Sequence, residues 1–487
     1  MGQILILAAV IIPIAGGLLL HLLNLRSDKA RNVYCEAVAV ITSVLVWAAI
    51  LTGPHGSFRI LRFTGDFYVA LHMDGMSMLF AGMVSLMWPL VLIYAFDYMS
   101  HAKHKKGFFA FYMMTYGVTL GVACAANIVT LYLFYEFLTI VTIPLVAHYR
   151  DHESMHVGRV YAGYVIGGAS ASLVAVVFAT MHGAGSFAHG GSAITGVSLG
   201  IIEAVYLFGF FGLGVKAAIF PLYKWLPMAS VAPTPVTALL HAVAVVNSGV
   251  FAVTRLTYYV FGPETLKGTW TQYLCLLVVS FNIVFAAVQA VRERHFKRRL
   301  AYSTVANLSY MLYGIMLMSD AGFTAGMSHM VFHGVTKIAL FMCAGAFMHV
   351  TGDKYIYEIN GVGKRMPVTF ALYTIGSLSL IGIPLFCGFV SKWALFTAGA
   401  AEGSPFAVAG IVALIIGAFL TGMYTLSVTF RAFMPMNGTD RYVGAKVSDA
   451  NWKILVPIGI FAALTVVFGI FPGPIMDLLS RIAAGAL

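Results

Sequence analysis

Long apolar segments follow one another along the whole chain, and short polar stretches separate them. About 20 consecutive apolar residues can cross the hydrocarbon core of a membrane as a helix, and very little sequence remains for a soluble domain. The pattern predicts an all-α polytopic membrane protein with about fourteen transmembrane helices. The predicted spans cover residues 3–23, 33–52, 75–96, 108–126, 128–148, 159–181, 197–220, 236–256, 270–290, 299–318, 323–350, 367–398, 406–430 and 453–474.

The charged residues fix an expected orientation. Only 10% of the 487 residues are charged, and 21 of the 29 lysines and arginines lie in loops after odd-numbered predicted spans. Five are assigned to the loops and ends of the other side, namely Arg59, Arg62, Arg255, Lys267 and Arg481. We expect the chain in the cytoplasmic membrane of a bacterium or archaeon. Short cytoplasmic loops collect basic residues, so both termini are expected on the side of the membrane away from the cytoplasm. Such loop clusters, including the basic run 292–299, account for the net charge of +11 through topology and contact with anionic lipid. No nucleic-acid partner is needed.

The two ends and the cysteines give little sign of other chemistry. The first span follows Met1 without a basic stretch, so we expect a retained helix and not a cleaved signal. The chain ends soon after the last predicted span, without a long lateral helix. No close cysteine pair suggests a metal site, an iron–sulfur cluster or a disulfide framework. We expect no cofactor in this chain, so redox chemistry would belong to a partner. The cysteines are Cys35, Cys124, Cys275, Cys343 and Cys387.

Four ionisable residues stand out inside the predicted spans. These are Glu136 in the fifth, Lys216 in the seventh, Lys337 in the eleventh and Lys392 in the twelfth. A charge at the depth of the bilayer costs a few kcal/mol or more, roughly 3 on insertion scales, so such residues face a bundle interior and mark an ion or proton path. The sequence therefore predicts an ion-conducting membrane protein.

Two prolines lie close to these lysines, one directly after the seventh predicted span and one inside the twelfth. Pro221 follows Lys216, and Pro384 precedes Lys392. Proline opens a helix, and lipid tolerates the opening only where protein or water satisfies the freed backbone groups. Paired broken helices in two halves of a chain indicate an inverted repeat with a site near the midplane; simple kinks in packed helices are the alternative. The predicted parts are residues 1–107 (helices 1–3), 108–256 (first five-helix repeat), 257–432 (second repeat) and 433–487 (helix 14).

Five sequence pieces, in order between about residues 75 and 430, resemble one family. It is the antiporter-like proton-channel family shared by respiratory complex I, membrane-bound hydrogenases, formate hydrogenlyases and Mrp-type cation/proton antiporters. One such piece would be a weak signal, but five in order are a strong one. The pieces lie at residues 133–137, 216–241, 297–304, 329–337 and 382–392.

The resemblance implies a role for the first two charged residues. Glu136 resembles the family's fifth-span glutamate, which pairs with the seventh-span lysine, here Lys216. An opposite charge nearby keeps both groups ionised, and its loss favours their neutral forms. Lys216 is therefore expected to release and regain a proton under the control of Glu136. A static ion pair with a structural role is the alternative, although buried pairs contribute little to stability.

Histidines extend the predicted path. His241 lies in the next span, where relay of protons competes with a hydrogen-bonded core role. His329, His333 and Lys337 recur at steps of four and therefore share one helix face. Two histidines at this spacing can bind zinc, but no Cys, Asp or Glu accompanies them, so a relay is favoured over a metal site. Lys392 resembles the family's terminal residue, which exchanges protons with the outer side.

One position departs from the family pattern. Asn247 stands where many members carry an eighth-span lysine, and an amide can orient water but cannot carry the proton. The relay between Lys216 and Lys337 would then depend on His241 and water. A scaffold that conducts poorly is the alternative consequence of this substitution.

Three functions stay open at this point. The first is a proton-translocating subunit of a complex I-like NADH/quinone oxidoreductase or related hydrogenase, without redox chemistry of its own. The second is the D-type subunit of a Mrp-type cation/proton antiporter, with Na⁺ as the cation. The third is a membrane scaffold. In each case we expect a multisubunit assembly in which the chain lies beside other membrane subunits, including homologous antiporter-like ones.

Overall fold

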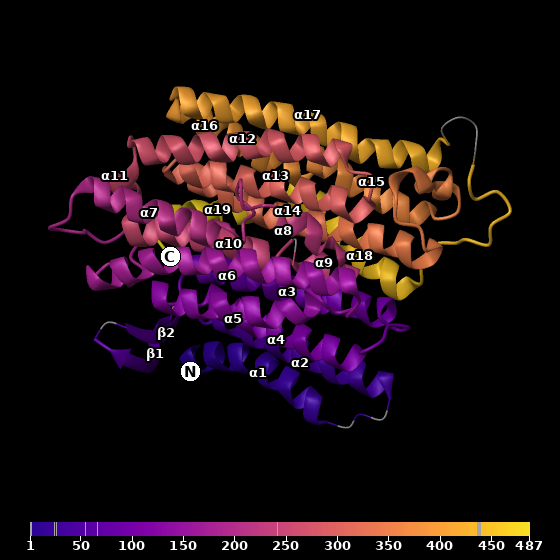
Figure 1. The fold of residues 1–487 in the computed structure, drawn as a ribbon, viewed down its shortest axis with the longest axis horizontal. Coiled ribbons are helices and arrows are strands. Elements are labelled where there is room, and N and C mark those ends of the chain that lie inside the picture. Colours follow the sequence, from indigo (N-terminus) through magenta and orange to yellow (C-terminus); the bar gives the residue numbers. More distant parts are fainter. Residues whose placement is uncertain are drawn as a thin grey trace.

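Long helices lie side by side along one direction in the computed structural model, which describes residues 2–23, 25, 27–53, 55–65, 67–240, 242–435 and 440–487 (Figure 1). The longer ones are α1 (Gly2–Leu22), α2 (Asp28–Leu51), α3 (Gly75–Tyr98), α4 (Lys105–Ala123), α5 (Ile128–Val146), α6 (His152–Met181), α7 (Leu199–Gly214), α12 (Trp270–Arg292), α13 (Phe296–Met316), α14 (Asp320–Thr351), α15 (Pro367–Ile381), α16 (Cys387–Glu402), α17 (Pro405–Phe433) and α18 (Trp452–Ile470).

Shorter elements connect or interrupt these helices. They are β1 (His55–Thr64), β2 (Phe67–Met73), α8 (Trp225–Met228), η1 (Ala229–Val231), α9 (Thr234–Leu240), α10 (Val245–Arg255), the π-helix η2 (Leu256–Phe261), α11 (Pro263–Leu266), η3 (Ile356–Ile359), η4 (Val362–Lys364) and α19 (Gly473–Ala483).

The helices follow the apolar pattern of the sequence. Ten helical runs in the described part are long and apolar enough to cross a membrane, and α7 and α15 are shorter apolar helices. The count of fourteen spans, the inverted repeats and the four-part division stay predictions. The boundary predicted at residue 256 falls inside a helical run, because η2 continues α10 as far as Phe261.

Three features were not predicted. Strands β1 and β2 form an antiparallel hairpin between α2 and α3, where the sequence suggested a loop. The amphipathic helix α19 follows the last predicted span. The eighth predicted span, expected to be continuous, is divided into α9 and α10.

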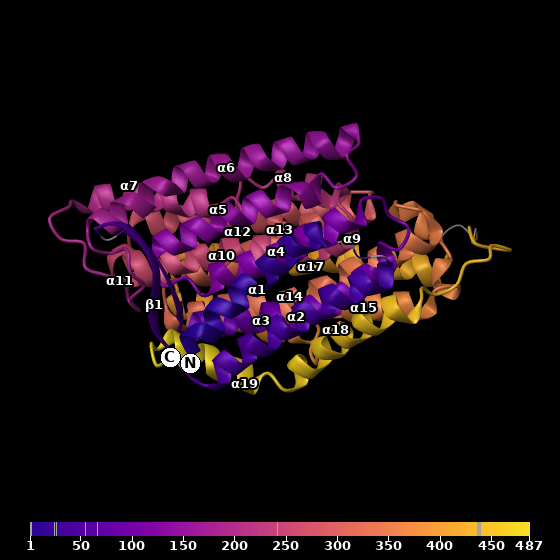
Figure 2. The ribbon, with the colours of Figure 1, turned by 90° about the horizontal axis from the view of Figure 1, so that it is seen from below.

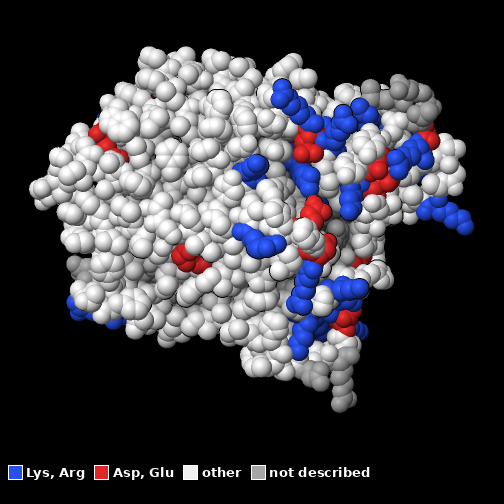
Figure 3. Space-filling view, in the orientation of Figure 1, with Lys and Arg blue, Asp and Glu red and all other residues white. Residues whose placement is uncertain are grey.

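Charge is distributed unevenly along the bundle. Figure 3 shows lysine, arginine, aspartate and glutamate side chains gathered at one end, where the links α3–α4 and α12–α13 lie. Both chain termini lie towards the opposite end in Figures 1 and 2. This arrangement agrees with the clustering of basic residues in alternate loops of the sequence.

The innermost helices carry the polar residues of interest. Every described residue of α9, α10 and η2 is buried, and α14 contacts α13, α15, α16 and α18. Small residues allow helices to approach closely in membranes, where the hydrophobic effect does not drive helices together. At the α1–α4 contact, for example, a Cβ on Gly117 would lie 2.5 Å from the Val10 carbonyl oxygen, so this crossing admits only glycine.

A buried ion pair joins the hairpin side of the molecule to its centre. The Arg255 guanidinium donates to both carboxylate oxygens of Asp74, each at 2.6 Å, and to the Ser77 hydroxyl at 3.2 Å. Asp74 also caps α3 by accepting the Ser77 amide N–H at 2.9 Å. The sequence pattern placed Arg255 among the loop residues of the outer side. The structure corrects this, because the side chain is 1% exposed and aromatic rings of Phe187 and Tyr259 pack over it.

We expect the Arg255→Met variant to lose stability. Removing one partner of a buried pair leaves the other charge uncompensated and costs about 3 kcal/mol or more of the free energy of unfolding. In this variant the uncompensated charge is the carboxylate of Asp74. The measurement is denaturant unfolding of the purified protein in mild detergent, followed by circular dichroism.

The matched control is Arg441→Met. Arg441 pairs with Asp353 at 3.1 Å, but its side chain is 48% exposed, so its loss should cost less than about 1 kcal/mol. Equal losses in the two variants would show that the Asp74–Arg255 pair does not hold these elements together.

Candidate functional site

The first candidate centre lies where α7 ends. The helix stops at Gly214, Lys216 and Pro221 lie in the turns that follow, and α8 begins at Trp225. Side chains of neighbouring elements satisfy carbonyls freed by this break. The Trp225 indole donates to the Val215 oxygen at 2.8 Å, and the Asn282 amide on α12 donates to the Ala218 oxygen at 3.1 Å. The break is therefore supported by protein and not by lipid.

The Lys216 ammonium contacts Tyr135 on α5. It is fully buried, donates to the Tyr135 carbonyl oxygen and lies 3.5 Å from the centre of the Tyr135 ring. The Tyr135 hydroxyl donates to the Leu213 oxygen at 2.6 Å, which ties α5 to the end of α7. Glu136 is the next residue on α5, and one of its carboxylate oxygens is buried without a hydrogen-bond partner. No ion pair within 4.0 Å joins these two described residues, Glu136 and Lys216.

The second break separates α9 from α10. His241, the predicted relay residue of this region, lies outside the described residues. The Asn247 amide donates to the Ala242 carbonyl oxygen at 2.8 Å, while its own carbonyl oxygen is buried without a partner. A Cβ on Gly334 of α14 would lie 3.5 Å from the same Ala242 oxygen, so the break faces α14 next to His333.

Gly249 links the two breaks. It is the α10 residue that lies against the backbone of Lys216 and Ala217, and a Cβ there would come closer than 3.0 Å to both. The backbone that carries Lys216 therefore rests directly on α10, two residues after Asn247.

The polar stripe predicted on the eleventh span lies on α14, where all three residues are buried. His329 shares hydrogen bonds with Ser391 on α16 at 2.8 Å and with Asn307 on α13 at 3.1 Å. The Lys337 ammonium donates to the Ser303 hydroxyl oxygen at 2.6 Å. The Tyr424 hydroxyl on α17 donates to the same oxygen at 2.7 Å. The stripe is thus hydrogen-bonded to α13 and α16, and Ser303 connects it to Tyr424 of α17.

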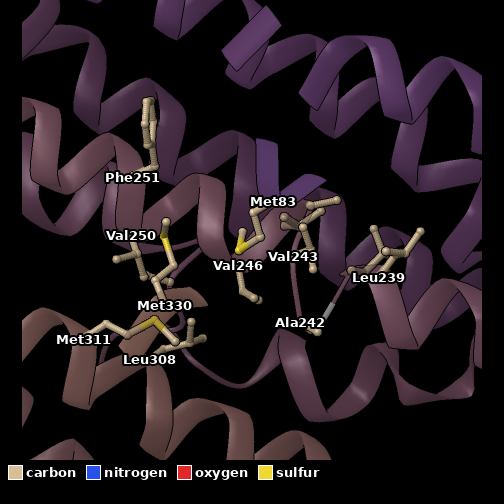
Figure 4. Packing of buried hydrophobic residues seen from close by; sticks show 14 of the residues in the cluster. Met83, Leu239, Ala242, Val243, Val246, Val250, Phe251, Leu308, Met311 and Met330 are labelled. Atoms are coloured by element: carbon tan, nitrogen blue, oxygen red, sulfur yellow. The ribbon is translucent and has the colours of Figure 1, made fainter. Parts of the chain in front are cut away.

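His333 lies between the other two residues of the stripe in a different environment. Its ring stacks on that of His329 with centroids 6.1 Å apart, and both of its ring nitrogens are buried without a hydrogen-bond partner. Figure 4 shows the apolar packing between α3, α10 and α14, to which Met83, Val246 and Met330 contribute. Apolar side chains therefore fill the space beside the polar residues of α10 and α14.

A further candidate centre lies at the third helix break, between α15 and α16. Pro384 falls in this interruption, which runs from the end of α15 at Ile381 to the start of α16 at Cys387. The Lys392 ammonium donates to the carbonyl oxygens of Leu380 at 2.7 Å and Ile381 at 3.1 Å. These carbonyls belong to the last turn of α15, where the helix dipole favours a cation.

Several polar partners were missed in the sequence. Ser303 and Asn307 lie four residues apart on α13 and face the stripe of α14, and that spacing is a signal the sequence contained. Tyr135 lies beside Glu136 in the first of the five family pieces, but nothing in that piece distinguishes it from the aromatic residues around it. Asn282 lies close to Ser280 on α12, and Tyr424 lies between Thr421 and Thr425 on α17, so no local pattern distinguishes these two from the polar residues around them.

A comparison with protein families bears on these centres. Residues 125–421 match the family described as NADH:quinone oxidoreductase/Mrp antiporter, transmembrane, which covers more than half of the chain. The chain belongs to this family. The resemblance seen in the sequence motifs is thereby confirmed, and the matched region contains Glu136, Lys216, Lys337 and Lys392.

Curated relatives include antiporter subunits. The chain is 30% identical over 439 residues to Na(+)/H(+) antiporter subunit A1 of Staphylococcus haemolyticus (strain JCSC1435), covering 83% of this chain and 52% of the relative. It is 29% identical over 445 residues to the same-named subunit of Staphylococcus aureus (strain Newman), with the same coverage. The chain thus spans about half the length of the curated relatives it matches.

Two solved structures share the fold. One belongs to the membrane-bound sulfane sulfur reductase, an archaeal respiratory membrane complex, with a TM-score of 0.85, 20% identity and coverage of 98% of this chain and 97% of the other. The second belongs to the Mrp complex from Dietzia sp. DQ12-45-1b, with a TM-score of 0.83, 18% identity and coverage of 99% and 97%. The predicted class, an all-α polytopic membrane protein, is confirmed.

The contact between α10 and Lys216 makes Gly249→Ala an informative variant. The added methyl group has to displace the backbone of Lys216 and Ala217, and such overpacking costs about 1–3 kcal/mol. We expect lower stability in detergent unfolding together with impaired transport in reconstituted vesicles.

Gly163→Ala on α6 is the control, because no atom lies within 4 Å of a Cβ at that position. Alanine favours a helix over glycine by about 1 kcal/mol, so this control should be neutral or slightly more stable. If Gly249→Ala behaved like the control, α10 would not fix the position of Lys216.

Proposed function

We propose that this chain is a proton-translocating membrane subunit of a complex I-like NADH/quinone oxidoreductase or of a related hydrogenase complex. The observation that carries the proposal is the set of three buried lysines, Lys216, Lys337 and Lys392. None has a carboxylate within 4.0 Å among the described residues. Ionisable groups are costly inside a membrane and mark ion or proton paths. Static counter-ion pairs do not account for these three.

The contacts suggest an order for the path. Protons would pass between Glu136 and Lys216, then across the α9–α10 break, where Gly249 and Gly334 bring α7, α10 and α14 together. Asn247 would orient water there, and His241 would take up the proton. Buried polar atoms without a protein partner are commonly satisfied by ordered water, and the amide oxygen of Asn247 is such an atom.

The second half of the path follows α14. His333 would receive the proton, Lys337 and His329 would pass it on, and Lys392 would exchange it with the outer side. His329 already shares a hydrogen bond with Ser391, the residue before Lys392. A positive charge on one group disfavours the protonated form of a neighbouring group. A proton that enters at one group of this stripe therefore weakens proton binding at the next. Transfer then proceeds in one direction when the field at Glu136 and Lys216 changes.

The proposal includes an orientation and partners. The charged end of the bundle would face the cytoplasm, and both termini would lie outside it, in accordance with the distribution of basic residues. The sulfane sulfur reductase and Mrp structures are multisubunit membrane complexes, and this chain would likewise lie beside other membrane subunits, including homologous ones. The chain itself would carry no redox cofactor.

A Na⁺/H⁺ antiporter is the second candidate. The staphylococcal relatives are named as antiporter subunits, and their match covers 83% of this chain. In that case a cation gradient, and not electron transfer, would change the field at Glu136 and Lys216. Purification of the intact complex with identification of its other chains separates the two, because redox cofactor-binding partners support the first and small membrane subunits alone support the second.

Transport by alanine variants tests the proposal itself. Lys216→Ala and Lys337→Ala should each reduce proton translocation by the assembled complex in vesicles by about 100-fold or more. A factor of about 100 is the lower end of the effect expected when a positioned proton-transfer group is lost. Translocation is measured with a pH-sensitive dye inside the vesicles.

Lys224→Ala is the matched control, since Lys224 lies eight residues after Lys216 but is exposed. It should transport normally. Full transport by assembled Lys216→Ala and Lys337→Ala complexes would contradict the proposal and favour a scaffold role.

A further inference from the structure

A cavity of about 380 Å³ opens at the charged end of the bundle, away from the path described above. It lies between the ends of α3 and α14, the beginnings of α6 and α13, and η1. Its lining combines basic, hydroxyl-bearing and apolar side chains, which are Tyr98, Tyr149, Glu153, Ser230, Val231, His295, Lys297, Arg298, Met348, Lys354 and Tyr355, together with Gly352.

The deepest polar groups of this cavity are hydrogen-bond donors. Lys297 is 4% exposed, and its ammonium donates to the Ala232 carbonyl oxygen at 2.7 Å, which leaves two further N–H groups. Ser230 is 1% exposed, and its hydroxyl has no hydrogen-bond partner. The Tyr98 hydroxyl accepts from Thr234 at 3.1 Å and retains its own hydrogen.

The imidazole of His295 adds a donor and not a charge. Burial and the nearby cations Lys297, Arg298 and Lys354 lower the pKa of His295 to about 4, so the ring is neutral at pH 7. Its Nδ1 accepts the Arg298 amide N–H at 3.5 Å, and the proton therefore belongs on Nε2.

The charges of the cavity are unbalanced. Arg298 and Lys354 contribute two positive charges, whereas the carboxylate of Glu153 is paired with Arg298 at 3.2 Å. Burial and the nearby Lys354 lower the pKa of Lys297 to about 7, and an anion bound beside its ammonium would favour the charged form. Donors and cations without a matching acceptor recognise an oxyanion, and charge-assisted hydrogen bonds to phosphate are among the strongest in proteins. Basic pockets between membrane helices on the cytoplasmic side bind phosphorylated head groups.

We propose that this cavity is a phosphate-binding site, occupied by the phosphate of a membrane phospholipid head group or by free inorganic phosphate. Lys297 and Ser230 hold its inner oxygens, and Arg298 and Lys354 neutralise it at the rim. Apolar Val231 and Met348 lie alongside and suit the acyl chains of a lipid. The site is independent of proton translocation, because it shares no residue with the path from Glu136 to Lys392.

The test uses the intact complex carrying wild-type chain, Lys297→Met or Ser230→Ala. Lys297→Met keeps the aliphatic stem and removes the ammonium. Ser230→Ala removes a hydroxyl that has no protein partner, so folding should be unaffected and this variant decides if Lys297→Met fails to assemble. Lys364→Met is the control, since Lys364 lies on η4 between α14 and α15, is exposed and does not line the cavity.

Two measurements distinguish the sources of phosphate. Mass spectrometry of the intact complex after exchange into lipid-free detergent counts the retained phospholipids, and equilibrium dialysis with ³²P-orthophosphate measures binding of the free anion. One phospholipid per chain retained in wild type and lost in Lys297→Met supports a lipid ligand. Orthophosphate bound by wild type and about tenfold more weakly by Ser230→Ala supports free phosphate, in line with loss of one hydrogen bond to a charged group.

The proposal is wrong if wild type, Lys297→Met, Ser230→Ala and Lys364→Met retain the same phospholipids and bind no orthophosphate. The cavity would then be a water-filled entrance. It is equally wrong if Lys364→Met loses the ligand to the same extent as Lys297→Met, because the binding would then follow the total charge of this end and not a built site.

Discussion

Three ammonium groups lie in an apolar bundle with no carboxylate within 4.0 Å among the described residues, and this is the constraint on which the structure depends. Lys216 donates to the Tyr135 carbonyl and Lys392 to two carbonyls at the end of α15, while Lys337 donates to the Ser303 hydroxyl. A carboxylate would hold the ammonium charged, whereas a neutral carbonyl or hydroxyl stabilises it without preventing release of the proton. At Lys392 the interruption after α15 supplies carbonyls that a continuous helix would use internally.

The same constraint explains the close contacts around the breaks. An opened helix in a membrane needs protein around it, and Trp225 and Asn282 satisfy the carbonyls released after α7. Gly249 lets α10 support the backbone that carries Lys216, and Gly334 brings α14 to the Ala242 carbonyl. Three helices thereby meet where the path passes from one half of the chain to the other. Apolar side chains fill the remaining space, as Figure 4 shows.

The sequence predicted the features that depend on composition within one segment. Apolar length predicted the helices, and lysine, histidine or proline within apolar runs predicted where chemistry and interruptions concentrate. The break between α9 and α10 carries no proline, so an apolar run of this kind looks the same whether the helix is continuous or divided. Arg255 was misplaced because its partner Asp74 lies 181 residues away in the chain. Tertiary partners decide both cases, and no local pattern records them.

Asn247 shows how the constraint acts on the middle of the path. The Asn247 amide donates to the Ala242 carbonyl oxygen, which lies next to α14 at Gly334. Its unpaired oxygen can orient water, but it cannot take up a proton. In the proposed path, transfer between Lys216 and the stripe of α14 would therefore depend on the entry of water beside Asn247, because this amide cannot itself take up and release the proton.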